Sequence, residues 1–250
     1  MGNPYVIIGT GAAGMAAAER LRLLKPDATI QMLSIDEYSH SRCMLHKFLS
    51  GERDEEGLSF VPEDFFEKKQ ILWGKGQKVT GIDPKQKQVL LEQGYLPYEK
   101  LLIATGSVYG IPPIPGFRTA ANVFGFRDLS DAQKMKKVIQ EQDVKHVFIV
   151  GSGLVGLDVA YALLERGIKV TIAEMAERVL PLQTDTTSAQ AYQELFEKAG
   201  AVFKLGIGAS DSVVNDQNQI TAVKLSNGEE ISCDFVVCAA GVRPNLAFLE

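Results

Sequence analysis

One arrangement of residues occurs twice in this chain, 142 positions apart. In each copy a short apolar run leads into a Gly-x-Gly-x-x-Gly segment, at 9–14 and at 151–156. A helical pattern follows each segment, and a second apolar run comes next, at 29–33 and at 169–173. Strand, glycine turn, helix and strand in this order predict a βαβ unit with a parallel sheet. The chain therefore has an internal repeat of a whole supersecondary unit.

The three glycines of such a turn have separate tasks. The first allows a tight turn, the second lets a pyrophosphate approach the backbone, and the third lets the helix pack closely on the strand. The N–H groups at the helix N-terminus then face the phosphates. The candidate nucleotide-binding residues are Gly9, Gly11, Ala13 and Gly14 in the first copy, and Gly151, Gly153, Leu154 and Gly156 in the second.

An acidic residue at the end of the second strand is the further requirement of such a site. In the second copy Glu174 stands there, placed for ribose hydroxyls. A carboxylate repels a 2′-phosphate, so Glu174 favours NADH over NADPH, although Arg178 is near enough to serve a 2′-phosphate. In the first copy the equivalent position is Ser34, and we expect Asp36, just beyond it, to bind the ribose there.

Composition excludes several other classes of protein. The chain has 250 residues and a net charge of −5, which gives no electrostatic reason to expect nucleic acid or an anionic membrane surface as a partner. No apolar run approaches the roughly 20 residues of a membrane span. The first residues lack the basic region and cleavage site of a signal peptide, so we expect none. Three cysteines are too few for a disulfide framework, and the three histidines form no metal-ligand pattern. We expect a cytoplasmic protein.

Four further segments are informative. Three follow the repeats along the chain: Ala104-Thr105-Gly106, Ile114-Pro115-Gly116 and Cys238 to Asn245. The fourth comes directly after the first repeat and reads Ser41-Arg42-Cys43-Met44-Leu45-His46-Lys47. With the two glycine turns, these segments resemble the pyridine nucleotide-disulfide oxidoreductases, and the segment from Ser41 to Lys47 is similar to that of rubredoxin-reductase-like and nitrite-reductase-like members. The resemblance implies an α/β protein with two Rossmann-like domains, which bind FAD over 1–110 and NADH over 111–243. Residues 244–250 begin the return to the first domain.

The resemblance also implies roles for individual residues. Arg42 and Lys47 would lie near the flavin, where Lys47 stabilises developing negative charge, and Asp158 would lie near the nicotinamide. Two positions differ from the family pattern: Leu154 replaces an aromatic residue that shields the flavin, and Asp158 replaces a Glu. Further cofactor-binding candidates are Val79, Ala104, Thr105, Gly106 and Gly241.

The resemblance implies an enzyme that takes hydride from NADH and passes electrons to a small redox protein or metal centre. The family's closing Gly-Asp segment of the FAD site is not in this sequence, so a continuing chain or a second chain would complete the site. An alternative is reduction of a disulfide, peroxide or oxygen through Cys43, which we expect to share a helix face with Lys47. A third reading is a nucleotide-binding subunit or a truncated fragment without turnover.

Cys233 and Cys238 have the C-x4-C spacing of the disulfide-active members. On an extended strand they would lie about 16 Å apart and point to opposite faces. That distance exceeds the reach of a disulfide, so we expect none between them.

Overall fold

The computed structural model describes residues 2–249, which form two compact units. The first holds residues up to 41, 55–108 and those from 244, and the second holds 42–54 and 109–243. The division expected near residue 110 therefore differs in one segment: residues 42–54 pack with the second unit. Which unit binds which nucleotide stays a prediction at this point.

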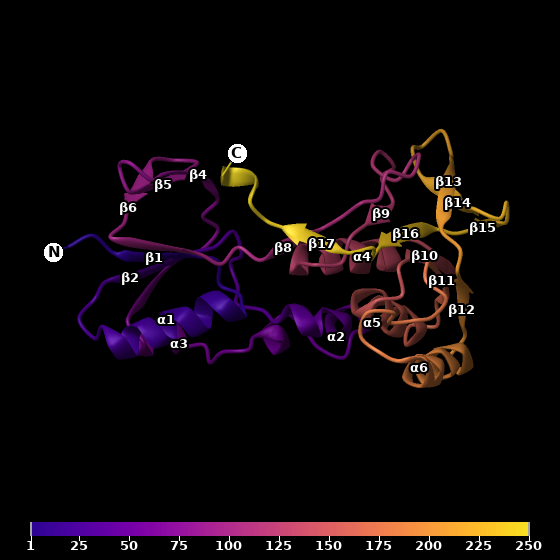
Figure 1. Ribbon diagram of the computed structural model, residues 1–250, viewed down its shortest axis with the longest axis horizontal. Helices are drawn as coiled ribbons and strands as arrows, with labels where there is room; N and C mark the ends of the chain where they lie inside the picture. Colours follow the sequence, from indigo (N-terminus) through magenta and orange to yellow (C-terminus); the bar gives the residue numbers. More distant parts are fainter. Residues whose placement is uncertain (1, 250) are drawn as a thin grey trace. The chain divides into compact units, whose positions relative to one another are not determined.

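The first unit is a parallel sheet covered on both faces (Figure 1). Its strand order is β3-β2-β1-β7, with bounds Ile71–Gly74, Ile30–Leu33, Tyr5–Ile8 and Lys100–Ile103. Helix α1 (Ala12–Leu24) lies on one face together with α3 (Phe65–Lys68), and ends just before Pro26, which cannot continue a helix. The other face carries the antiparallel sheet β4 (Val79–Asp83), β5 (Gln88–Leu91) and β6 (Tyr95–Pro97).

Alternation along the strands divides the core of the first unit into two clusters. Ile7, Ile30 and Met32 pack with Met15 and Ala18 on the helical face. Val6, Ile8 and Leu33 point the other way and pack with Val89 and Tyr98 under the antiparallel sheet. Successive strand residues face opposite sides, so both faces must be apolar, as expected for a buried parallel sheet.

The second unit repeats this plan (Figure 1). Its parallel sheet has the order β12-β11-β10-β16-β9, with bounds Ala201–Leu205, Lys169–Glu174, His146–Val150, Phe235–Cys238 and Val123–Phe124. Helix α5 (Leu154–Leu164) packs on β10 and β11, and α6 (Thr186–Lys198) packs on β12. The antiparallel sheet β13 (Ala209–Val214), β14 (Ile220–Leu225) and β15 (Glu230–Ser232) covers the other face, where Phe148, Val223 and Val236 form the core.

Two helices complete the second unit. Helix α4 (Leu129–Glu141) begins with a capping box: the side chain of Asp128 accepts the backbone N–H of Asp131, and the side chain of Asp131 accepts the backbone N–H of Asp128. The 3₁₀ turn η1 (Arg42–Met44) leads into α2 (Leu45–Ser50), which contacts α4 and α5. The remaining short elements are η2 (Glu56–Leu58), η3 (Ala247–Leu249) and the paired strands β8 (Ser107–Tyr109) and β17 (Val242–Pro244).

The predicted α/β fold with two Rossmann-like units is confirmed, since each unit has a parallel sheet, a crossover helix after its glycine turn and an antiparallel sheet on the opposite face. Across residues 2–249, the helices are all too short or too polar to cross a bilayer.

Candidate functional site

The second glycine turn has the backbone that its sequence requires. Gly151 has a φ of +104°, and a Cβ there would lie 2.7 Å from the carbonyl oxygen of Ala239. A Cβ on Gly156 would fall far inside van der Waals contact of the Gly151 carbonyl. Gly153, in contrast, has no atom of the protein within 4 Å of an added Cβ. The first and third glycines are thus needed by the fold, whereas the second leaves open space for a ligand.

Helix α5 begins directly after this turn without a side-chain cap. Its N-cap is Gly153, and no side chain accepts a hydrogen bond from the N-terminal N–H groups. Helix α6 of the same unit, in contrast, is capped by Asp185, whose carboxylate accepts the N–H of Ser188 at 2.8 Å. Uncapped N–H groups at the positive end of a helix dipole form a site for a phosphate.

A cavity of about 690 Å³ opens beside this turn, at the carboxyl ends of β10 and β11. Five of the predicted residues line it: Gly151, Gly153, Leu154, Glu174 and Gly241. Gly156 lies under the helix and Asp158 is outside the lining. The volume lies in the range of natural ligand pockets, and the location is the edge of the sheet where α/β folds bind ligands.

Glu174 is held at the cavity wall by backbone groups. Its Oε2 accepts hydrogen bonds from the N–H and the hydroxyl of Ser152, at 2.9 and 3.2 Å, and its Oε1 accepts the N–H of Ala176 at 3.0 Å. A carboxylate has about four acceptor positions, so this arrangement fixes the side chain and leaves capacity for a ribose hydroxyl. Arg178, the candidate for a 2′-phosphate, instead donates to the carbonyl oxygen of Pro181 at 2.9 Å.

Sequence reasoning missed the loop that follows β11. Met175 and Leu182 of this loop line the cavity and are 81% and 91% exposed. Leu180 anchors the loop, since its N–H donates to the carbonyl of Ser152 at 3.0 Å and its φ is +48°, which is rare for a residue with a side chain. Two exposed apolar side chains beside a polar turn form a surface on which a flat ring could pack. The available signal was Met175, an apolar residue directly after the strand acid Glu174.

The first glycine turn has the same local geometry as the second. Gly9 has a φ of +111°, and a Cβ there would collide with the carbonyl of Ala104. Gly14 packs against the carbonyl of Gly9, and α1 begins after Gly11, again with no side-chain cap. Ala13 is exposed in the first turn of α1. This cradle and its uncapped N–H groups fit a second dinucleotide pyrophosphate.

The other candidates of the first unit have protein partners. The hydroxyl of Ser34, at the end of β2, accepts the N–H of Asp36 at 2.9 Å, which forms a tight turn that leaves Asp36 half-buried. The hydroxyl of Thr105 donates to the carbonyl of Asn245 at 2.7 Å, and the N–H of Asn245 donates to the carbonyl of Gly106. Val79 begins β4 and packs at the edge of the core. Cofactor binding by these residues stays a prediction.

The segment expected beside the flavin lies in the second unit. Arg42 donates from Nε and Nη2 to Oδ1 of Asp128, the N-cap of α4, both at 2.8 Å. Cys43 is exposed in the η1 turn. Cys43 and Lys47 were expected to share one face of a helix. This expectation is wrong, because α2 begins only at Leu45 and Cys43 lies before it.

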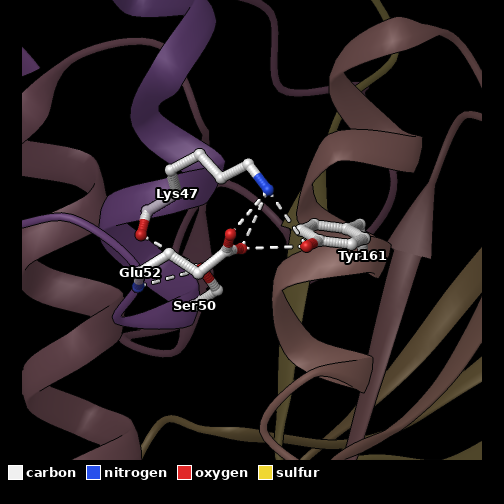
Figure 2. A network of polar contacts seen from close by, with 4 residues as sticks. All are labelled: Lys47, Ser50, Glu52 and Tyr161. Atoms are coloured by element: carbon white, nitrogen blue, oxygen red, sulfur yellow. Dashed lines mark hydrogen bonds and ion pairs between the residues drawn. The ribbon is translucent and has the colours of Figure 1, made fainter.

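Lys47 is the centre of a polar network (Figure 2). Its Nζ lies 2.7 and 3.0 Å from the two carboxylate oxygens of Glu52 and 3.0 Å from the hydroxyl of Tyr161. Asp158, one turn before Tyr161 on α5, faces His46, with Oδ2 3.8 Å from Nδ1. Burial raises the pKa of the Asp158 carboxyl above its ordinary value, against the opposing effect of His46.

The three cysteines are free. Cys238 ends β16, whereas Cys233 precedes this strand, so the expectation that both lie on one strand is wrong. Burial raises the pKa of both thiols to about 12, which makes them unreactive at neutral pH. In the described part of the chain, no group of three or more His, Cys, Asp or Glu side chains is arranged to hold a metal ion.

Two uncapped helices after glycine turns, each in its own Rossmann-like unit, define a protein that binds two dinucleotides. Residues 3–250 match the family model described as pyridine nucleotide-disulphide oxidoreductase, and the chain belongs to this family.

Two relatives illustrate the match. The chain is 32% identical over 250 residues to the rubredoxin–NAD(+) reductase of Alcanivorax borkumensis, covering 99% of this chain and 64% of that protein. It is 31% identical over 243 residues to the nitrite reductase [NAD(P)H] of Bacillus subtilis, covering 96% of this chain and 30% of that protein. The chain thus spans less than two thirds of the length of these relatives.

A solved structure agrees with the fold. The ferredoxin reductase for the CYP199A2 system of Rhodopseudomonas palustris superposes with a TM-score of 0.89 at 28% identity, over 98% of this chain and 61% of that one.

Proposed function

We propose that this chain carries the NADH-binding and FAD-binding parts of an oxidoreductase that takes hydride from NADH and passes electrons to a small redox protein. The observation that supports it most directly is the cavity beside Gly151 and Gly153, with Glu174 fixed at its wall. The names of the relatives support the acceptor class, since they include a rubredoxin–NAD(+) reductase and a ferredoxin reductase.

Each residue has a defined task in this proposal. The N–H groups at the start of α5 bind the pyrophosphate of NADH, and Glu174 binds the adenosine ribose and repels a 2′-phosphate. Leu154 borders the cavity with an apolar side chain that is 59% exposed. Gly9, Gly11 and Gly14 hold the pyrophosphate of FAD on α1. FAD, when bound, supplies the hydride acceptor, and Lys47 supplies a fixed positive charge.

The remaining expectations belong to the same proposal. Asp36, Thr105 and Gly106 bind FAD, and a continuing or second chain completes the FAD site. A reducing compartment such as the cytoplasm fits the three free cysteines.

The flavin part of the proposal is tested by absorbance. We expect the purified chain, reconstituted with FAD under anaerobic conditions, to show the bands of oxidised flavin and to lose them when NADH is added. If FAD is not retained, or if the bands persist with NADH, the chain has no such activity and is a nucleotide-binding subunit or a fragment.

The NADH part is tested by calorimetry with Glu174→Gln. The amide keeps the acceptor for the Ser152 N–H but lacks the negative charge, so we expect the preference for NADH over NADPH to fall about tenfold. Glu177→Gln is the matched control, because Glu177 is an exposed acid three residues further on and outside the cavity. An equal effect of both variants would assign the preference to net charge instead of to Glu174.

The exposure of Cys43 favours a second candidate, reduction of a disulfide, peroxide or oxygen through this thiol. Cys43→Ser separates the two. We expect the variant to keep NADH-dependent reduction of a one-electron acceptor such as ferricyanide or rubredoxin. Loss of that activity would instead assign the chemistry to the thiol.

A further inference from the structure

The turn that follows helix α2 places the carboxylate of Glu52 next to the ammonium group of Lys47. Helix α2 ends at Ser50, and Gly51 follows with a φ of +93°, the left-handed conformation that reverses the chain. The reversal brings Glu52 back beside Lys47, and the Ser50 hydroxyl donates to Oε1 of Glu52 at 3.0 Å (Figure 2). The acid is therefore placed by a glycine cap and not by helical spacing.

Tyr161 joins this pair from α5. Its hydroxyl accepts from Lys47 at 3.0 Å and donates to Oε1 of Glu52 at 2.9 Å, so the phenol uses its donor and an acceptor together. Lys47 Nζ also lies 4.6 Å from the centre of the Tyr161 ring. The three hydrogens of the ammonium group are thus directed at Glu52 and Tyr161. Lys47 retains its charge but has no hydrogen to spare for another acceptor.

The other charged groups on the elements around Lys47 have different contacts. On α5, Asp158 faces His46, and Arg166 donates to the carbonyl of Leu49. On α4, Lys136 lies over the ring of Phe48, and Asp128 at its N-terminus binds Arg42. The nearest described carboxylate of Lys47 is therefore Glu52.

We propose that Glu52 and Tyr161 are positioning residues that keep Lys47 charged and in one orientation during hydride transfer, so that Lys47 acts as a fixed charge and not as a proton donor. This inference rests on the proposed function. The hydrogen bonds to Glu52 and then to Tyr161 raise the pKa of Lys47, and the bond to Lys47 lowers that of Glu52 to about 2. The side chain of Lys47 is 28% exposed, so water competes for its ammonium unless these two groups hold it.

The first experiment needs no cofactor. The alkaline titration of Lys47 is followed by the ¹³Cε shift of labelled lysine, with the signal assigned by its loss in Lys47→Arg. We expect Glu52→Gln to lower the titration midpoint, and Tyr161→Phe to lower it less. Glu165→Gln is the control, because this exposed acid at the end of α5 carries the same charge outside the network. Equal shifts in Glu52→Gln and Glu165→Gln would overturn the proposal.

The second experiment measures bleaching of bound FAD by NADH in stopped flow. We expect Glu52→Gln to slow bleaching about tenfold with unchanged NADH affinity, since a charge that is no longer held in place loses part of the rate gained from exact positioning. Glu52→Asp should recover part of the rate. In Glu52→Gln the bleaching rate should fall at alkaline pH, where Lys47 loses its proton. A normal rate and profile in Glu52→Gln, with a moved lysine titration, would overturn the positioning role. Absence of bleaching in the unsubstituted protein would instead overturn the proposed function, and with it the role of Glu52 and Tyr161 in hydride transfer. The lysine titration would still report whether Glu52 holds Lys47.

Discussion

The two glycine turns of this chain have nearly the same backbone geometry, but the residues around them differ. Gly9 and Gly151 have φ values of +111° and +104°, and each packs against the carbonyl of an alanine that follows a neighbouring strand, Ala104 or Ala239. Gly14 and Gly156 each touch the first glycine of their own turn. What differs is the end of the second strand, where one unit has Ser34 and the other has Glu174.

That difference changes what each turn can select. Ser34 closes a local turn by accepting the N–H of Asp36, whereas Glu174 crosses to the glycine turn and accepts the N–H of Ser152. A fixed carboxylate at this position recognises ribose hydroxyls and rejects a 2′-phosphate. In the proposed function the glycines bind the pyrophosphate, and the residue at the strand end selects the dinucleotide.

The neighbouring strands differ as well. Leu102 of β7 and Val237 of β16 have the same place in the two sheets, opposite Ile7 and Ile149, respectively. Leu102 is 41% exposed and Val237 is fully buried, because β9 continues the second sheet beyond β16 whereas β7 ends the first one. The same strand is an edge in one unit and a core strand in the other.

Replacing the third glycine should have the largest effect, and the same one in both units. Gly14→Ala and Gly156→Ala each place a methyl group on a backbone carbonyl, so we expect each to lose at least about 3 kcal/mol of unfolding free energy or to fail to fold. Denaturant unfolding measures the loss. A tolerated alanine at only one of the two positions would show that the turns are not equivalent.

The reactivity of a cysteine thiol should differ strongly between the end of β16 and the end of β7. Burial raises the pKa of Cys238 to about 12 from an ordinary value of 9.0, so its thiolate is roughly 10³-fold rarer than that of an exposed thiol. Ile103 has the equivalent place on β7 and is 38% exposed. With Cys43 and Cys233 replaced by Ser, we expect Ellman's reagent to leave Cys238 unmodified and to label an Ile103→Cys variant rapidly. Equal rates would contradict the difference in burial.

Truncation of the paired strand residues should differ by a smaller amount. Val237→Ala leaves a cavity in a closed core and should cost about 2 kcal/mol, whereas Leu102→Ala should cost under about 1 kcal/mol, because its side chain already meets solvent. Hydrogen exchange of β10 and β1 reports each unit separately. A larger loss from Leu102→Ala would mean that β7 is covered in solution by a further strand.

The middle glycine should affect binding without affecting stability. Gly153→Ala meets no protein atom within 4 Å, so we expect normal unfolding but about tenfold weaker NADH binding by calorimetry. Unchanged affinity would place the pyrophosphate elsewhere in the cavity.

The smallest expected effect concerns Asp158, which stands on α5 where α1 has Ala16. Because burial raises the folded-state pKa of Asp158 above the ordinary 3.8, the folded protein binds more protons than the unfolded one between these two pKa values, and this residue lowers stability as pH rises through that range. We expect Asp158→Asn to raise Tm slightly at pH 7, with the gain vanishing as pH falls toward 3.8. Its side chain is 44% exposed, which keeps the effect small. A variant less stable than the original protein at pH 7 would show that the contact with His46 outweighs the burial cost.

Local sequence signals were sufficient for much of this fold. Apolar runs and glycine spacing predicted β1, α1, β2, β10, α5 and β11 within a few residues, because each signal acts over one turn or one strand. Helix α4 was missed although Asp128 and Asp131 form a capping box before it. A helix was expected at α2, but it begins later than expected, since the 3₁₀ turn η1 holds Cys43 and α2 starts at Leu45.

The sequence by itself determined that two tight glycine turns exist, because the glycine spacing between an apolar run and a helical pattern occurs twice. The structure gives the reason for each glycine: a positive φ at Gly9 and Gly151, and a backbone carbonyl at the Cβ position of Gly14 and Gly156. Tertiary structure decided which other residues surround them. The bond from Ser152 to Glu174 spans 22 residues and that from Lys47 to Tyr161 spans 114, and no local period encodes either. Such contacts depend on how whole elements pack. That packing placed residues 42–54 in the second unit and surrounded Lys47 with Glu52 and Tyr161.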